Sequence, residues 1–201
     1  ISEVNAVQVS NLLRQVSVLY ELSDQLKFEE LAKEMIAIGQ KFNNEFIVED
    51  GLLLLLDHSI DNGQYAKADS LFNAGYQSLE QAGLKLVMQM QMFYNEIEDY
   101  ERSLLYAKQL KKLALAYNSY IFLNAAVEGE NIAYNFLGLK DSISANKNRI
   151  AALAIPDYEK YRMLSLCFTF LNTDSAIFYQ KQVVPMVKHD KELLYFAYSK
   201  L

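Results

Sequence analysis

The sequence predicts an all-α fold built as a stack of helix pairs, and three observations support this prediction. The chain has 201 residues, is 52% hydrophobic and contains only 7 glycines and 2 prolines, which leaves little material for strands or long loops. Apolar residues recur at helical spacing, as at Tyr65, Ala68, Phe72 and Tyr76. A unit of two helices and a tight turn also returns at intervals of 33 to 40 residues.

The clearest unit lies between Leu52 and Leu79. Residues 52–60 are apolar on most sides, which is typical of a buried helix. The turn follows at residues 61–63, Asp-Asn-Gly, because Asn and Gly tolerate positive φ. A second helix then begins near Tyr65 and carries one apolar stripe. This unit serves as the reference for finding the others.

The other units are found from the residue that takes the place of Tyr65 at the start of each second helix. Phe28 and Tyr100 fill this aromatic position well, whereas Lys140 and Thr173 mark it less clearly. We expect helix pairs near 3–22 with 25–42, 47–60 with 64–81, 84–97 with 99–117, 119–137 with 141–153, and 157–171 with 174–188.

The pattern Gly–x–Tyr–x–x–Ala–x–x–x–Phe, from Gly63 to Phe72, resembles the second half of a tetratricopeptide repeat. The recurring words ADSLF, KDSI and TDSAIF resemble those of tetratricopeptide arrays in bacterial sensors and regulators. The resemblance implies a right-handed α-solenoid in a single domain over residues 1–201. Large residues at the small-residue position, Leu31 and Ile143, depart from the pattern and require wider helix spacing. The implied repeats are 1–45, 46–82, 83–118, 119–155 and 156–188, followed by a terminal helix at 190–201.

Two prolines and the last segment shape the C-terminal part. Pro156 ends the helix before it, and Pro185 should kink or end its helix near Val184, since it removes a backbone donor. Residues 190–201 are strongly apolar and fit either a capping helix or the first half of a sixth repeat. The same segment is the predicted contact if the chain forms a homodimer.

Composition narrows the range of partners and compartments. A net charge of −6 and a pI near 5.0 argue against a nucleic-acid surface. No apolar run approaches the roughly 20 residues that cross a bilayer, and the chain begins at Ile1 without a signal-peptide pattern, so we treat it as a mature or trimmed fragment. The sole cysteine, Cys167, fits a reducing compartment. A cytoplasmic location is favoured, and a periplasmic one follows if a signal or anchor was removed.

Catalysis finds little support in the sequence, and we expect no enzyme, cofactor or metal site. His58 and His189 are far apart, and neither belongs to a cluster with metal-ligand spacing. We expect His58 on a helix surface. Cys167 lies in the apolar run MLSLCFTF, which favours a buried structural thiol over a nucleophile.

The resemblance implies that the first helix of each pair lines a concave groove. The residues assigned to this groove are Tyr20, Asp57, Asp61, Lys85, Met88, Met92, Asn95, Glu96, Glu128 and Asn135. Some tetratricopeptide domains bind the C-terminal carboxylates of chaperones through a Lys and an Asn on the first helix of their opening repeat. Val16 and Tyr20 occupy those positions here, so this binding mode is not expected.

Each groove feature has a functional reading and a structural alternative. Asn95 and Asn135 fall at equivalent positions and either hold an extended peptide backbone or cap helix ends. The acidic residues Asp57, Asp61, Glu96 and Glu128 either attract a basic ligand or form a solvated surface. Met88 and Met92 are adaptable contacts or core, whereas Met90 is expected in the core. Tyr158, Tyr161 and Phe168 either anchor a partner or pack against the last helix.

These features lead to a hypothesis with two alternatives. The chain is predicted to be a protein- or peptide-binding scaffold or sensing module of a larger bacterial regulatory or signalling protein, with its ligand in the groove. A basic peptide is the favoured ligand, and neither nucleic-acid binding nor a membrane span is expected. The alternatives are a small-molecule-sensing repeat domain and a homo-oligomerisation module.

Overall fold

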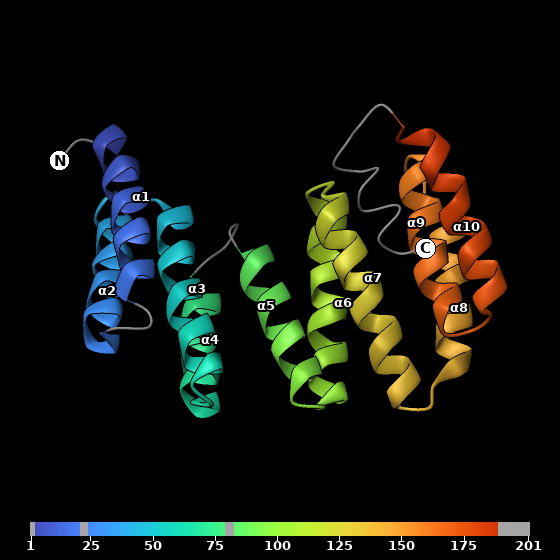
Figure 1. Ribbon diagram of the computed structural model, residues 1–201, viewed down its shortest axis with the longest axis horizontal. Coiled ribbons are helices and arrows are strands. Elements are labelled where there is room, and N and C mark those ends of the chain that lie inside the picture. Colours follow the sequence, from blue (N-terminus) through green and yellow to red (C-terminus); the bar gives the residue numbers. More distant parts are fainter. Residues whose placement is uncertain (1–2, 21–23, 79–82, 189–201) are drawn as a thin grey trace. The chain divides into compact units, whose positions relative to one another are not determined.

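The computed structural model describes residues 3–20, 24–78 and 83–188, and this part of the chain is all-helical, as the sequence predicts (Figure 1). The helices follow one another with short turns and pack in adjacent pairs. Their bounds are α1 Glu3–Tyr20, α2 Gln25–Lys41, α3 Glu45–Asp61, α4 Tyr65–Ser78, α5 Gly83–Glu96, α6 Tyr100–Ala116, α7 Tyr120–Phe136, α8 Lys140–Ala151, α9 Asp157–Thr169 and α10 Thr173–Met186. The expected terminal helix at 190–201 and His189 lie outside the described residues.

The contacts divide the chain into two compact units, Ile1–Gln89 and Met90–Leu201, and the division falls inside α5. In the first unit α1 packs on α2 and α3, α2 packs on α3, and α3 packs on α4. In the second unit α7 packs on α6, α8 and α9, and α9 also packs on α8 and α10. One continuous repeat array across both units stays a prediction. Among the described residues, no helix is both long and apolar enough to cross a membrane.

The turns between helices use the left-handed conformation where the sequence places glycine or asparagine. Gly63 and Gly138 have φ of +67° and +72°, and Asn43 and Asn118 have φ of +51° and +52°. At Gly63 the turn closes in the manner of a Schellman motif, since the next amide, of Gln64, donates to the carbonyl oxygen of Ser59 at 2.8 Å. Asn43, Gly63, Asn118 and Gly138 therefore end helices, and they account for the accuracy of the predicted boundaries.

Several second helices begin with a side chain that caps free backbone amides. Asp24 accepts a hydrogen bond from the amide of Lys27, and Asp99 accepts one from Arg102. Asn172 does the same for Ser175 at the start of α10. Such caps satisfy N–H groups that have no partner within the helix, and each typically contributes about 1 kcal/mol. Local sequence thus fixes where α2, α6 and α10 begin.

The first unit has a core in which helices approach closely. Phe28 and Met35 of α2, Leu56 of α3 and Phe72 of α4 are fully buried. Gly51 of α3 lies directly against α2, because a Cβ there would sit 2.8 Å from Ile36 Cγ1 and 3.0 Å from the Ala32 carbonyl oxygen. The absence of a side chain at position 51 therefore sets the α2–α3 spacing.

The core of the second unit contains residues that depart from the repeat pattern. Leu110, Leu123, Ile143 and Met163 are fully buried there. Ile143 therefore fits the interior although a small residue was expected at its position. Gly129 of α7 meets the side chain of Gln91, since a Cβ at this glycine would lie 2.5 Å from Gln91 Nε2. The absence of a side chain at position 129 thus leaves room for the Gln91 side chain.

Pro185 lies inside α10, and the helix ends one residue later, at Met186. The predicted end near Val184 is therefore correct to within two residues. Val187 beyond it is buried, and its amide donates to the carbonyl oxygen of Val183 at 3.2 Å. Val187 therefore belongs to the same buried apolar cluster as Val183 in the last turn of α10.

The close packing at Gly51 makes a prediction about stability. Gly51→Ala should lower the free energy of unfolding by about 1–2 kcal/mol, because overpacking against the α2 backbone outweighs the gain of up to about 1 kcal/mol in helix propensity. Gly83→Ala is the matched control, since a Cβ there meets nothing within 4 Å. Urea denaturation of the two variants checks this expectation. Equal stability of both variants would show that the α2–α3 contact adapts to the extra methyl group.

Candidate functional site

In the first unit, the first helices of successive pairs lie side by side. Asp50 of α3 contacts Arg14 of α1 at 3.8 Å and Lys85 of α5 at 3.1 Å. Asp50 and Lys85 are 35 residues apart, close to one repeat length of the predicted array, and the structure brings them together. The ammonium of Lys85, a predicted ligand contact, is engaged by Asp50 within the chain. All three side chains reach solvent, and exposed ion pairs of this kind contribute little to stability.

The other predicted groove residues of this unit lie on the same helices with differing exposure. Tyr20 is partly exposed at the end of α1, and Met88 of α5 is half-buried. Asp57 and Asp61 are one turn apart on α3, which places them on one face, and Asp61 is the exposed member. The acidic character predicted for this face therefore reaches solvent mainly at the end of α3.

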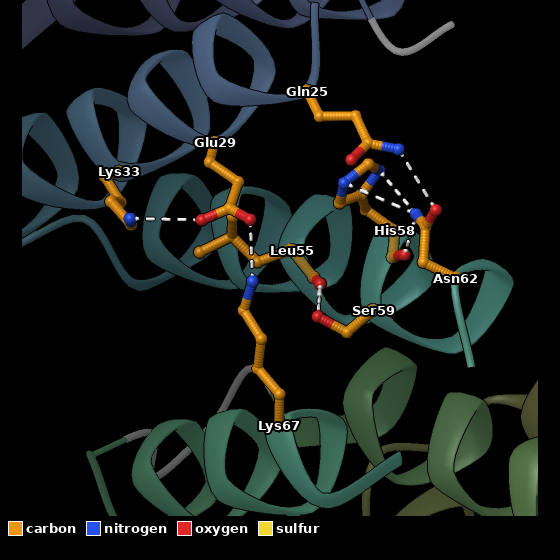
Figure 2. Close-up of polar contacts among 8 residues, drawn as sticks. All are labelled: Gln25, Glu29, Lys33, Leu55, His58, Ser59, Asn62 and Lys67. Atoms are coloured by element: carbon orange, nitrogen blue, oxygen red, sulfur yellow. Dashed lines mark hydrogen bonds and ion pairs between the residues drawn. The ribbon is translucent and has the colours of Figure 1, made fainter. Parts of the chain in front are cut away.

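Second helices also meet each other, as the ion pairs of Glu29 show. Glu29 of α2 lies between Lys33 of its own helix at 3.2 Å and Lys67 of α4 at 2.7 Å (Figure 2). The hydrogen bond from Lys67 is the largest influence that lowers the pKa of this carboxyl. The contact therefore ties the second helix of one pair to the second helix of the next.

His58 corrects one expectation. The sequence places it on a helix surface, but its side chain is buried, with 3% of its area exposed. Its ring lies 4.7 Å from that of Phe28, and the Asn62 amide nitrogen lies 3.3 Å from its Nδ1. Gln25 in turn donates to Asn62 at 3.1 Å (Figure 2). The imidazole is buried because Phe28 covers its face, while Asn62 supplies a polar partner.

In the second unit the predicted groove residues are found on α5 and α7. Met90 is fully buried, which confirms its expected place in the core, whereas Met92 is 53% exposed. Asn95 accepts a hydrogen bond from the Ser103 hydroxyl of α6 at 3.2 Å, so its carbonyl oxygen contributes to the packing of its own helix pair. The remaining predicted residues are Glu96, which is exposed, and Glu128 and Asn135, which are half-buried.

The aromatic residues proposed as anchors make contacts inside the second unit. Tyr158 and Tyr161 pack against Val183 and Val187. Phe168 stacks on Tyr179 of α10, with ring centroids 5.2 Å apart. These rings therefore hold α10 against α9. Their expected contact with the helix at 190–201 lies outside the described residues.

A shallow hollow lies where α5 turns into α6. Its volume is about 390 Å³, and Leu137, at the end of α7, completes its wall. The Tyr100 ring lines this hollow and stacks on Phe136, with centroids 4.5 Å apart and planes 4° apart. The turn residues that contribute are Ile97, Glu98, Asp99 and Glu101. This hollow combines a flat aromatic surface with carboxylates.

A buried chain of polar groups crosses the second unit, and the sequence interpretation missed it. Lys111 of α6 donates to Glu130 of α7 and, at 3.1 Å, to the Asn146 carbonyl oxygen of α8. Asn146 donates to Asn131 at 3.1 Å, and Asn131 donates to the Cys167 sulfur at 3.3 Å. Four helices are therefore joined through their side chains.

The sequence does hold a signal for this polar chain. Asn124, Val127, Asn131 and Tyr134 follow one another on α7 at spacings of three and four residues, and all four are buried. The two asparagines thus lie on the same buried face of α7 as the apolar residues, and not on the solvent face. Polar residues in that phase indicate a hydrogen-bonded interior.

Cys167 is the buried structural thiol that the sequence predicts. Burial raises the pKa of its thiol to about 11, so the reactive thiolate is disfavoured at neutral pH. Across residues 3–20, 24–78 and 83–188, no three His, Cys, Asp or Glu side chains gather in a way that suits a metal ion. Searches of protein-family models and of curated proteins find no match for this chain. We therefore infer its function from its own residues and contacts.

The Lys111–Glu130 pair gives a second prediction. Glu130 is 1% exposed, so Lys111→Met leaves a buried carboxylate without its cation, and the free energy of unfolding should fall by about 3–5 kcal/mol. The double variant Lys111→Met, Glu130→Gln should recover part of this loss because it removes the buried charge. Urea denaturation of the two variants and the wild type measures the recovery. Equal losses in the single and double variants would contradict an electrostatic role for the pair.

Proposed function

We propose that the chain is a tetratricopeptide-like, right-handed α-solenoid of about five helix pairs, whose first-helix layer binds a protein or peptide segment. The proposal includes no catalytic role. By resemblance, the module belongs to a larger bacterial regulatory or signalling protein.

The observation that carries this proposal is the similar spacing, 35 to 38 residues, of contacts between neighbouring pairs. First helices are joined by Asp50 with Lys85 and by Asn124 with Glu159, each 35 residues apart. Second helices are joined by Glu29 with Lys67, 38 residues apart, and by Lys111 with Asn146, 35 residues apart. Contacts of like helix to like helix at close to one repeat length are expected of stacked repeats.

The second unit supplies the chemistry that favours a basic and partly apolar peptide. Met92 offers an exposed, adaptable apolar side chain at one predicted groove position. Glu96 and Glu128 add negative charge on α5 and α7, which attracts and orients a positively charged segment. Asn135 is the groove asparagine favoured for bonding a peptide backbone, because the carbonyl oxygen of Asn95 accepts from Ser103.

The hollow beside Tyr100 supports a peptide over a small molecule. It is shallow and open, and two exposed carboxylates, Glu98 and Glu101, line it. Small-molecule sites usually bury most of their ligand in a mainly apolar cavity. A basic side chain of a bound peptide suits an open acidic hollow better.

A binding experiment with matched charge changes tests the proposal. The first probe is a labelled pool of peptides composed of Lys, Arg and Leu. The second is a matched pool in which Glu replaces Lys and Arg. Fluorescence anisotropy should show binding of the basic pool only, weakened about five- to tenfold by Glu96→Gln with Glu128→Gln, since the exposed Glu96 contributes about 0.2–1 kcal/mol and the half-buried Glu128 a similar amount.

The control removes the same charge from another surface. Glu30→Gln with Glu34→Gln neutralises two exposed carboxylates of α2, a second helix, and should leave the affinity nearly unchanged. Equal weakening by both pairs of changes would indicate attraction to the overall negative charge. A wild-type chain that binds neither pool would contradict the proposed basic ligand.

A further inference from the structure

Glu49 of α3 reaches the start of the next first helix, α5. Its carboxyl oxygen accepts a hydrogen bond from the Leu86 amide at 3.4 Å, although only 2% of the residue is exposed. The first four amides of a helix lack partners inside it, and together they carry a partial positive charge. Glu49 therefore caps a helix of the neighbouring pair from a buried position.

The surroundings of Glu49 are mostly apolar. Gly75 of α4 lies against Leu52 and Leu86, since a Cβ there would sit 2.7 Å from one Leu52 methyl and 3.6 Å from one of Leu86. Leu52, about one turn after Glu49 on α3, and Gly75 of α4 thus bring apolar groups together beside Leu86, the residue whose amide donates to Glu49.

The charges near Glu49 are already engaged with one another. The charge of Lys85 of α5 lowers the pKa of Glu49, and the charge of Asp50 of α3 raises it. The Lys85 ammonium lies 3.1 Å from Asp50, and Arg14 of α1 lies 3.8 Å from the same carboxylate. Asp50 therefore holds both cations at the surface while Glu49 remains buried beside them.

Burial raises the pKa of Glu49 from its ordinary value of 4.5 to about 7, against the opposing influence of the Leu86 amide and Lys85. The packed arrangement therefore binds a proton more tightly than an opened one, in which the carboxyl regains its ordinary pKa. The resulting stabilisation is fully present below about pH 4.5 and is lost as the pH rises through about 7.

We propose that the contact between α3 and α5 is a proton-sensitive joint, closed while Glu49 carries a proton and opened more often once this carboxyl is ionised. Asp50 and Lys85 lie at the surface of the same joint, so opening also separates the charges that connect the two helices. This inference does not depend on peptide binding.

Hydrogen exchange of the full chain tests the joint directly. The measured quantity is the opening constant of the Leu86 and Val87 amides, corrected for base-catalysed exchange, between pH 5 and pH 8. In the wild type it should rise about 70-fold over this range, as proton linkage requires for pKa values of 4.5 in the opened and about 7 in the packed arrangement. In Glu49→Gln, whose neutral amide keeps an acceptor for Leu86, it should stay flat. Glu34→Gln removes an exposed carboxyl of α2 and should behave as the wild type.

A second measurement needs no variant. The side-chain carboxyl of Glu49, followed by carbon-13 NMR in the wild type, should titrate near pH 7. A transition near pH 4.5 would overturn the proposal, and so would a pH-dependent opening constant in Glu49→Gln equal to that of the wild type. An opening constant of the wild type that does not change between pH 5 and pH 8 would also overturn the proposal.

Discussion

In the proposed array each helix pair needs its neighbour to complete its interior, and within each unit contacts between helices of successive pairs meet that need. Two helices joined by a short turn leave one apolar side uncovered, so stability comes from stacking. Glu29 with Lys67 and Lys111 with Asn146 mark where second helices meet within each unit. Around these polar contacts the apolar residues are buried, as Phe72 and Ile143 are. The polar pairs therefore fix the alignment of surfaces whose attraction is hydrophobic.

Glycine has two separate uses in this architecture. At Gly63 and Gly138 it permits positive φ, so the chain reverses within a few residues. At Gly51 and Gly129 the backbone is helical, and the missing side chain lets another group come close. The first use determines where helices end. The second sets the α2–α3 spacing at Gly51 and makes room for the Gln91 side chain at Gly129. Four of the glycines thus lie where the backbone has positive φ or where a neighbouring group occupies the space of a side chain.

The sequence predicted what depends on local chemistry and missed what depends on distant neighbours. Helix ends at Asn43, Gly63 and Gly138 follow from residues that tolerate positive φ, whereas Glu98, with φ of +61°, carries no such signal. The burial of His58 depends on Phe28, thirty residues earlier, and the sequence gives no direct sign of that pairing. For the candidate site, repeat spacing identified exposed residues such as Met92 and Glu96. It assigned Lys85 to the ligand, whereas Asp50, one repeat length earlier in the chain, already engages the Lys85 ammonium.

The hydrogen bonds of Asn146 in the second unit restrict the rotation of α8 about its own axis. This helix is short, and Ile143 and Ile150 are its buried apolar residues, a small area with which to fix its orientation. Asn146 lies between them and bonds to α6 and α7 at once. A rotation of about 100°, one residue along the helix, would bring Ala145 or Lys147 to that place. Neither side chain can both donate to Asn131 and accept from Lys111, so the amide of Asn146 selects one angular setting of α8.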